Sequence, residues 1–174
     1  MRRYKTIILF ACLSLSISAY AQKIVSTEVD DFTGVNKVRT SWEYIGYSMG
    51  FSPKVRILKN NDLYLINLKA ITHPKTLSVD ENNRFLIKFE DGTILELYNS
   101  EYTASCVGCG ATGLGGSEGH GINLYFRANE QDLFDIKNKT IVKVRLEANQ
   151  GYFESKTKLK HALKIKELAT LIIK

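Results

Sequence analysis

Two cysteines and a nearby histidine are the side chains whose types and spacing could do chemistry. Cys106 and Cys109 form a C-x-x-C pair, and His120 follows after a run of glycines. Closing so short a ring with a disulfide stabilises a fold by about 2 kcal/mol in the chain-entropy model. A redox-active pair is a second interpretation, but thioredoxin-type chemistry needs a helix N-terminus at the first cysteine, and here glycines follow.

A zinc site is the third interpretation of these residues. Cys106, Cys109 and His120 are ligands of the right kind, but a closed structural site has four. His73 or Glu118 would have to supply the fourth ligand. One C-x-x-C with one histidine is a weak signal, so we predict no metal site and no cofactor.

The glycine-rich segment from Ser105 to Gly121 also matches two catalytic motifs. Its first glycines fit G-x-G-x-x-G, the dinucleotide-binding fingerprint, and Ser117 fits G-x-S-x-G, the serine nucleophile elbow. Both motifs need a strand that turns directly into a helix. More glycine and then a strand pattern follow here, so we predict no catalytic residue in this loop.

Aromatic residues form a second group of candidates. Trp42 and Tyr44 share one face of a predicted strand, and Tyr47 and Phe51 follow closely. Exposed rings at this spacing can stack on a sugar or hold a peptide, whereas the commoner use of such rings is to fill a core. We keep Trp42, Tyr44 and His120 as candidate ligand-binding residues.

The N-terminus has the parts of an export signal. Basic residues at positions 2, 3 and 5 precede an apolar run that ends near Ile17, and Ala19-Tyr20-Ala21 follows. The run is shorter than the roughly 20 residues that span a bilayer. We therefore predict a cleaved leader at 1–21 and a periplasmic or secreted mature chain. Lipidation at Cys12 is the less favoured alternative, because the bulky Phe10 stands in the lipobox-like sequence.

Export bears on both the cysteines and the charge. An oxidising compartment favours a structural disulfide between Cys106 and Cys109. The whole chain has 24 basic and 18 acidic residues, a formal charge of +6. Loss of three basic leader residues leaves 21 against 18, or +3, which removes the main support for a nucleic-acid partner. A lysine-rich C-terminal segment leaves a weak association with an anionic envelope surface open.

Hydrophobic alternation of period two dominates the mature chain and predicts strands. Residues 85–89 and 94–98 flank Asp91-Gly92, which is a strong hairpin signal. Asn60-Asn61-Asp62 predicts a second hairpin. Further strands are predicted at Val35–Trp42, Val55–Lys59, Leu63–Lys69, Ile122–Arg127 and Ile141–Glu147.

Two segments predict helices. Asn129 is a capping residue before a short helix of about two turns. Ser155 is a plausible N-cap for a longer amphipathic helix that ends near Ile173. The predicted fold is α+β and mainly β, in one domain over 22–174. It is a curved antiparallel sheet or flattened barrel of six to eight strands, covered by the C-terminal helix, with a β-sandwich as the alternative.

Several segments carry a resemblance to other proteins: Ala19-Tyr20-Ala21-Gln22, Asp30-Asp31-Phe32-Thr33-Gly34, Thr40-Ser41-Trp42-Glu43, Phe89-Glu90-Asp91-Gly92-Thr93 and Ile141-Val142-Lys143-Val144-Arg145. Through them the chain resembles small exported proteins of unknown function of Bacteroidetes-type bacteria. The resemblance implies an antiparallel β domain with a terminal helix, in the periplasm or beyond. It transfers no catalytic residue.

The sequence thus predicts an exported, non-enzymatic binding or structural module of the cell envelope. It does not identify a partner, and a carbohydrate or a peptide is a candidate ligand. The alternative is a thiol/disulfide or metal-binding protein that acts through the Cys106-x-x-Cys109 loop.

Overall fold

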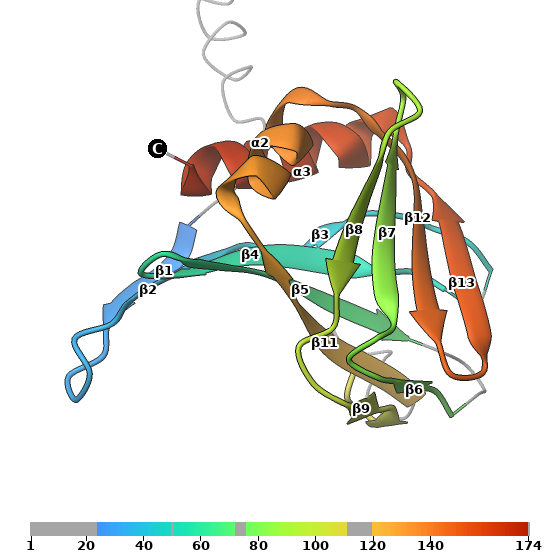
Figure 1. Cartoon of the computed structure of the whole chain (residues 1–174), viewed down its shortest axis with the longest axis horizontal. Coiled ribbons are helices and arrows are strands. Elements are labelled where there is room, and N and C mark those ends of the chain that lie inside the picture. The colour runs from blue at the N-terminus through green and yellow to red at the C-terminus, as the bar shows by residue number, and fades with distance from the viewer. Residues whose placement is uncertain (1–23, 50, 72–75, 111–119, 174) are drawn as a thin grey trace, which may run out of the picture.

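The computed structural model describes residues 24–49, 51–71, 76–110 and 120–173, which form antiparallel sheets and two helices (Figure 1). The helices are α2 (Glu130–Asn138) and α3 (Leu159–Ile172). The strands are β1 (Ile24–Val29), β2 (Asn36–Thr40), β3 (Glu43–Tyr44), β4 (Lys54–Asn60), β5 (Leu63–Ile71), β6 (Ser78–Val79), β7 (Arg84–Phe89), β8 (Ile94–Tyr98), β9 (Thr103–Ala104), β10 (Cys106–Val107), β11 (His120–Ala128), β12 (Ile141–Ala148) and β13 (Gly151–Lys156).

The larger sheet has seven strands, in the order β1-β2-β4-β5-β11-β10, with β3 paired to β4. Its central strands pair over long stretches: β5 runs antiparallel to β11, and Asn67 lies opposite Tyr125. Successive side chains of a strand point to opposite sides of the sheet. Ile66 and Leu68 of β5 are therefore buried on the inner face, whereas Lys69 stands on the outer face.

The second sheet has four strands, in the order β13-β12-β7-β8, and β6 pairs with β9 in a small two-stranded sheet. The predicted hairpin of β7 and β8 is confirmed, and Gly92 in its turn has a positive φ of 86°. The predicted hairpin of β4 and β5 is confirmed as well, with Asn61 at φ 51°. Glycine and asparagine are the residues that accept this left-handed region most readily.

Side chains from the inner faces of both main sheets form one buried cluster. Phe85 of β7 meets Phe126 of β11 with ring centroids 5.3 Å apart. Phe51 meets Phe153 of β13 in the same way, at 5.6 Å. Because one side of each strand is used for this core, the other side is left for solvent or a ligand.

The short helix α2 begins as predicted. The side-chain oxygen of Asn129 accepts a hydrogen bond from the backbone N–H of Asp132 at 2.9 Å, and the Asp132 carboxylate accepts one from the Asn129 N–H at 2.8 Å. This reciprocal pair is a capping box, which satisfies two backbone donors that a helix start leaves open. Leu133 and Ile136 then face the core.

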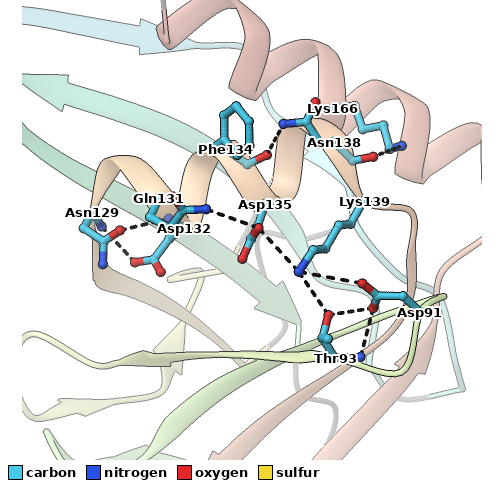
Figure 2. A network of polar contacts seen from close by, with 10 residues as sticks. All are labelled: Asp91, Thr93, Asn129, Gln131, Asp132, Phe134, Asp135, Asn138, Lys139 and Lys166. Carbon is cyan, nitrogen blue, oxygen red and sulfur yellow. Dashed lines mark hydrogen bonds and ion pairs between the residues drawn. The ribbon is translucent and has the colours of Figure 1, made fainter.

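A polar network connects α2 with the turn of the β7–β8 hairpin and with α3 (Figure 2). Lys139, which follows α2, lies 3.7 Å from the Asp91 carboxylate and donates to the Thr93 hydroxyl at 3.3 Å. Lys166 of α3 donates to the Asn138 carbonyl at 3.2 Å. The two helices are thus held beside each other at one end of the four-stranded sheet, as Figure 1 shows.

The C-terminal helix begins later than predicted. Ser155 does not cap it: the residue lies in β13 opposite Val144, and its hydroxyl donates to the Phe51 carbonyl at 3.0 Å. The turn at Gly151, with φ 126°, sends the chain back along β12 and so uses residues 151–156 as a strand. α3 starts at Leu159 and buries the apolar side chains Ala162, Ile165, Leu168, Ala169 and Ile172.

The predicted mainly-β antiparallel fold with a C-terminal helix is confirmed. Its strands lie in two main sheets, and neither sheet closes, so the fold takes the open form and not the barrel. Strands β1 and β13 and the two-residue strands β6, β9 and β10 have no counterpart in the prediction. Within the described residues, no helix has the length and apolarity needed to cross a membrane.

Candidate functional site

Cys106 and Cys109 form a close pair at the start of the glycine-rich segment. Their Cα atoms are 5.3 Å apart, within the usual range for disulfide-bonded cysteines. Cys106 lies in β10 opposite Gly121, and the backbone then turns at Gly108, which has φ 79°. The pair therefore sits on a tight turn at the edge of the larger sheet, and its exposed Val107 faces solvent.

Gly110 anchors this turn to the sheet by direct backbone packing. A Cβ atom built on Gly110 would lie 2.1 Å from the Ala70 carbonyl oxygen, and one built on Gly121 would lie 2.3 Å from the Gly110 nitrogen. Only glycine allows two backbones to approach so closely. The start of the glycine-rich segment is therefore fixed against β5 and β11.

The other sequence motifs of this segment do not assemble a metal or catalytic site within the described residues. His120 opens β11 opposite Val107. No group of three or more His, Cys, Asp or Glu side chains in the described ranges is arranged to hold a metal ion. His73, Ser117 and Glu118 lie outside the described residues. β11 begins at His120, so a strand follows the G-x-S-x-G match where a nucleophile elbow needs a helix.

The aromatic candidates divide between the core and the surface. Phe51 is buried in the core, whereas Tyr44 and Tyr47 are exposed and Trp42 is partly exposed. The core interpretation therefore holds for Phe51 alone. Trp42 lies across two cations of the larger sheet, 4.6 Å from the Arg56 guanidinium and 5.1 Å from the Lys69 amine, measured to the ring centroid.

These contacts define a surface on the outer side of β4, β5 and β11. We call it the Trp42 face. The pairing of Lys54 with Lys69, of Arg56 with Asn67 and of Asn67 with Tyr125 places these side chains on one side of the sheet. The Trp42 face consists of Trp42, Tyr44, Lys54, Arg56, Asn67, Lys69, Asn123, Tyr125 and Arg127.

The Trp42 face is basic because β4, β5 and β11, which supply most of its side chains, contain no acidic residue at any position. Lys54, Arg56, Lys69 and Arg127 supply the positive charge. Within the described ranges, Arg56, Lys69 and Arg127 make no ion pair with a carboxylate. Adjacent cations without carboxylates produce a positive potential that attracts an anion.

Arg56 lies at the centre of this surface and is held in one orientation. Its Nε donates to the Asn67 side-chain oxygen at 2.9 Å, and the Asn67 amide donates to the Asn123 side chain and to the Leu124 carbonyl, both at 2.8 Å. Tyr125 lies close enough to Arg56 to favour its charged form. Burial lowers the pKa of Arg56, which reflects the cost of removing its charge from water without a carboxylate beside it.

A depression of about 310 Å³ opens beside Arg56 on the same side of the sheet. Its volume is at the lower end of the range for small-ligand sites. Two cations at its edge are paired with acids. Lys37 lies 2.6 Å from Asp30, in the turn after β1, and Arg39 lies 3.6 Å from Glu28 of β1. The lining residues are Lys37, Arg39, Arg56, Leu58, Asn60, Leu65 and Tyr125.

The outer face of the four-stranded sheet offers a contrast, because carboxylates pair with both of its arginines, Arg84 and Arg145. Arg84 pairs with Glu147 at 2.8 Å and with Glu96 at 3.1 Å. Arg145 lies 4.4 Å from the centroid of the Tyr152 ring, much as Arg56 lies on Trp42, but it also pairs with a carboxylate, Glu154. The same cation and ring types are present on both sheets, and what distinguishes the Trp42 face is that β4, β5 and β11 contain no acidic residue.

A second depression, of about 550 Å³, follows the exposed side of α3 and is lined by Lys160, His161, Leu163, Lys164 and Glu167. Lys164 is already paired with Glu43 at 3.0 Å. Burial and then the neighbouring lysines hold the pKa of His161 below its ordinary value, and the Tyr44 ring meets the imidazole edge-on. Its mixed charge makes this depression a weaker candidate for a ligand site than the Trp42 face.

Comparison of the chain with protein-family models, with curated proteins and with solved structures found no match. The resemblance to small exported proteins therefore stays a prediction. Of the sequence candidates, Trp42 and Tyr44 belong to the Trp42 face, while His120 lies at the start of β11, beside the cysteine turn. Arg56 and Lys69 were missed, although the absence of acid from the three strand sequences is a signal that could have identified them.

Proposed function

We propose that this chain is an exported, non-enzymatic binding module of the cell envelope, and that the Trp42 face holds its ligand. The observation that carries the proposal is the contact of a partly exposed tryptophan with two cations, Arg56 and Lys69, that make no ion pair with a carboxylate among the described residues. Aromatic rings and arginine are residue types that binding surfaces concentrate. The leader-like N-terminus and the cysteine pair support export.

The test of export is to produce the full chain with its own leader in a Gram-negative host. We expect the protein in the periplasmic extract, with a mass that corresponds to a chain beginning at Gln22. Recovery of the intact 174-residue chain from the cytosol, with both thiols of Cys106 and Cys109 reduced, would reject export.

The test of binding uses the processed protein and isolated cell envelopes of the producing bacterium. We expect the protein to sediment with the envelopes, and added salt to release it, because salt screens exposed charge. Lys69→Gln should weaken this association, whereas Arg145→Gln, on the acid-containing sheet, should not. Equal sedimentation of all three proteins would show that the Trp42 face is not the binding surface.

The second candidate function is thiol, disulfide or metal chemistry at the Cys106–Cys109 turn. The close cysteine pair and its exposed position favour it. Titration of free thiols and metal analysis of protein from the periplasm would distinguish the alternatives. Two blocked thiols without metal would leave a structural disulfide, and a reduction potential well below that of glutathione would exclude exchange with the glutathione pool.

A further inference from the structure

The charge and shape of the Trp42 face specify what kind of ligand it can hold. Trp42 provides a flat apolar surface, and an aromatic ring packs well against the flat side of a sugar. Arg56 and Lys69 place positive charge over the ring, 4.6 Å and 5.1 Å from its centroid. A ligand that matches both features has a ring and an anionic group within one short unit.

Arg56 favours a planar anion over other anionic groups. The Asn67 oxygen takes the Nε donor and so fixes the plane of the guanidinium. The donors of its two terminal nitrogens suit the two oxygens of a carboxylate, which a guanidinium binds in a bidentate way. Among the described residues, the arginine has no such carboxylate, although it lies at the wall of a depression of about 310 Å³.

We propose that the ligand is an acidic polysaccharide whose sugar units carry carboxylates, with a sugar ring on Trp42 and a carboxylate on Arg56 and Lys69. This inference rests on the proposed function, because an exported protein meets envelope polysaccharides and not intracellular nucleic acid. Lys54 and Arg127 lie on the same face and would extend the contact to neighbouring units of a polymer.

The single tryptophan of the chain gives a direct assay. The emission of Trp42 is titrated with an oligogalacturonate, with a neutral glucan oligomer of the same length, and with an oligothymidylate of the same charge. We expect a saturable change with the oligogalacturonate that weakens with salt. The neutral glucan should produce no saturable change at the same concentrations.

Variants identify the residues responsible. Lys69→Gln and Arg56→Gln should each weaken oligogalacturonate binding about tenfold, the usual effect of losing a hydrogen bond to a charged group. Arg145→Gln is the matched control, since it removes a cation that lies on an aromatic ring but has Glu154 beside it. Its affinity should equal that of the unchanged protein. Circular dichroism of each variant shows whether it is folded, and Lys69 is not part of the hydrogen-bond network of Arg56, Asn67 and Asn123.

Three outcomes overturn the inference. Tighter binding of the oligothymidylate would assign the face to nucleic acid, and equal binding of the neutral glucan would assign it to stacking alone. No response to any probe would also reject an acidic polysaccharide. The proposed function would still be judged separately, by the salt-sensitive sedimentation with envelopes and its loss in Lys69→Gln.

Discussion

The backbone contact between Gly110 and Gly121 predicts that a single added methyl group at position 121 will disturb the cysteine turn. A Cβ atom there would lie 2.3 Å from the Gly110 nitrogen and 2.4 Å from its Cα. Ordinary contacts between carbon atoms are about 3.5–4.0 Å. Both contacted atoms are backbone, so no flexible side chain can move aside, and the Gly110 segment must shift away from β11.

The expected cost follows from this overlap. Extra methyl groups in tightly packed positions destabilise proteins by about 1–3 kcal/mol. For a chain of this size each kcal/mol lowers the melting temperature by about 2–4 °C, so a cost of about 2 kcal/mol gives a decrease of about 4–8 °C. Scanning calorimetry of Gly121→Ala measures the change. Val107→Ala, an exposed position on the neighbouring strand, is the control and should change stability by less than about 0.5 kcal/mol.

The cysteine pair should increase this cost, because Cys109 directly precedes Gly110 and limits how far the segment can move. In a chain with Cys106→Ser and Cys109→Ser, the Gly121→Ala substitution should therefore cost less than in the unchanged protein. A double-mutant cycle measures the difference, which we expect to exceed about 0.5 kcal/mol. A Gly121→Ala protein that melts within about 1 °C of the original would refute the reasoning.

Three further predictions concern stability. Asn129→Ala removes the cap of α2 and should cost about 1 kcal/mol in urea unfolding. The Arg84 guanidinium lowers the pKa of the Glu147 carboxyl from its ordinary 4.5. The contribution of this ion pair to folding stability is therefore complete above about pH 4.5 and is lost as the pH falls through the lowered pKa. Glu147→Gln should accordingly make the urea midpoint decline less steeply on the acid side. Asn67→Leu leaves the Arg56 Nε without its acceptor and should cost about 1–3 kcal/mol, measured by thermal unfolding.

Local signals in the sequence were enough to predict the elements that local interactions determine. The β7–β8 hairpin depends on Asp91-Gly92 and on alternation in the flanking residues, and α2 depends on the Asn129 cap. β13 could not be recognised in this way. Ser155 is a good capping residue in isolation, but the turn at Gly151 pairs its segment with β12, and its hydroxyl donates to the carbonyl of the distant Phe51.

The candidate site was harder to predict because it depends on strand register. Trp42 and Tyr44 could be singled out by type and spacing, but their partners come from β4 and β5 and are fixed by pairing across the sheet. Arg56 and Lys69 look like ordinary outward residues of amphipathic strands when each strand is read alone. Likewise, the need for glycine at Gly110 arises from a contact with Ala70 that no local pattern contains.

The pairing of β5 with β11 has a kinetic consequence. The two strands are separated by roughly fifty residues of chain, whereas β4–β5, β7–β8 and β12–β13 are neighbours along it. Closing a long loop costs entropy before its contacts are gained, so the adjacent hairpins should assemble early and β11 should insert late. Tyr125 and Asn123 arrive with β11, and the chain would therefore become competent to recognise a ligand only after this long-range pairing has formed.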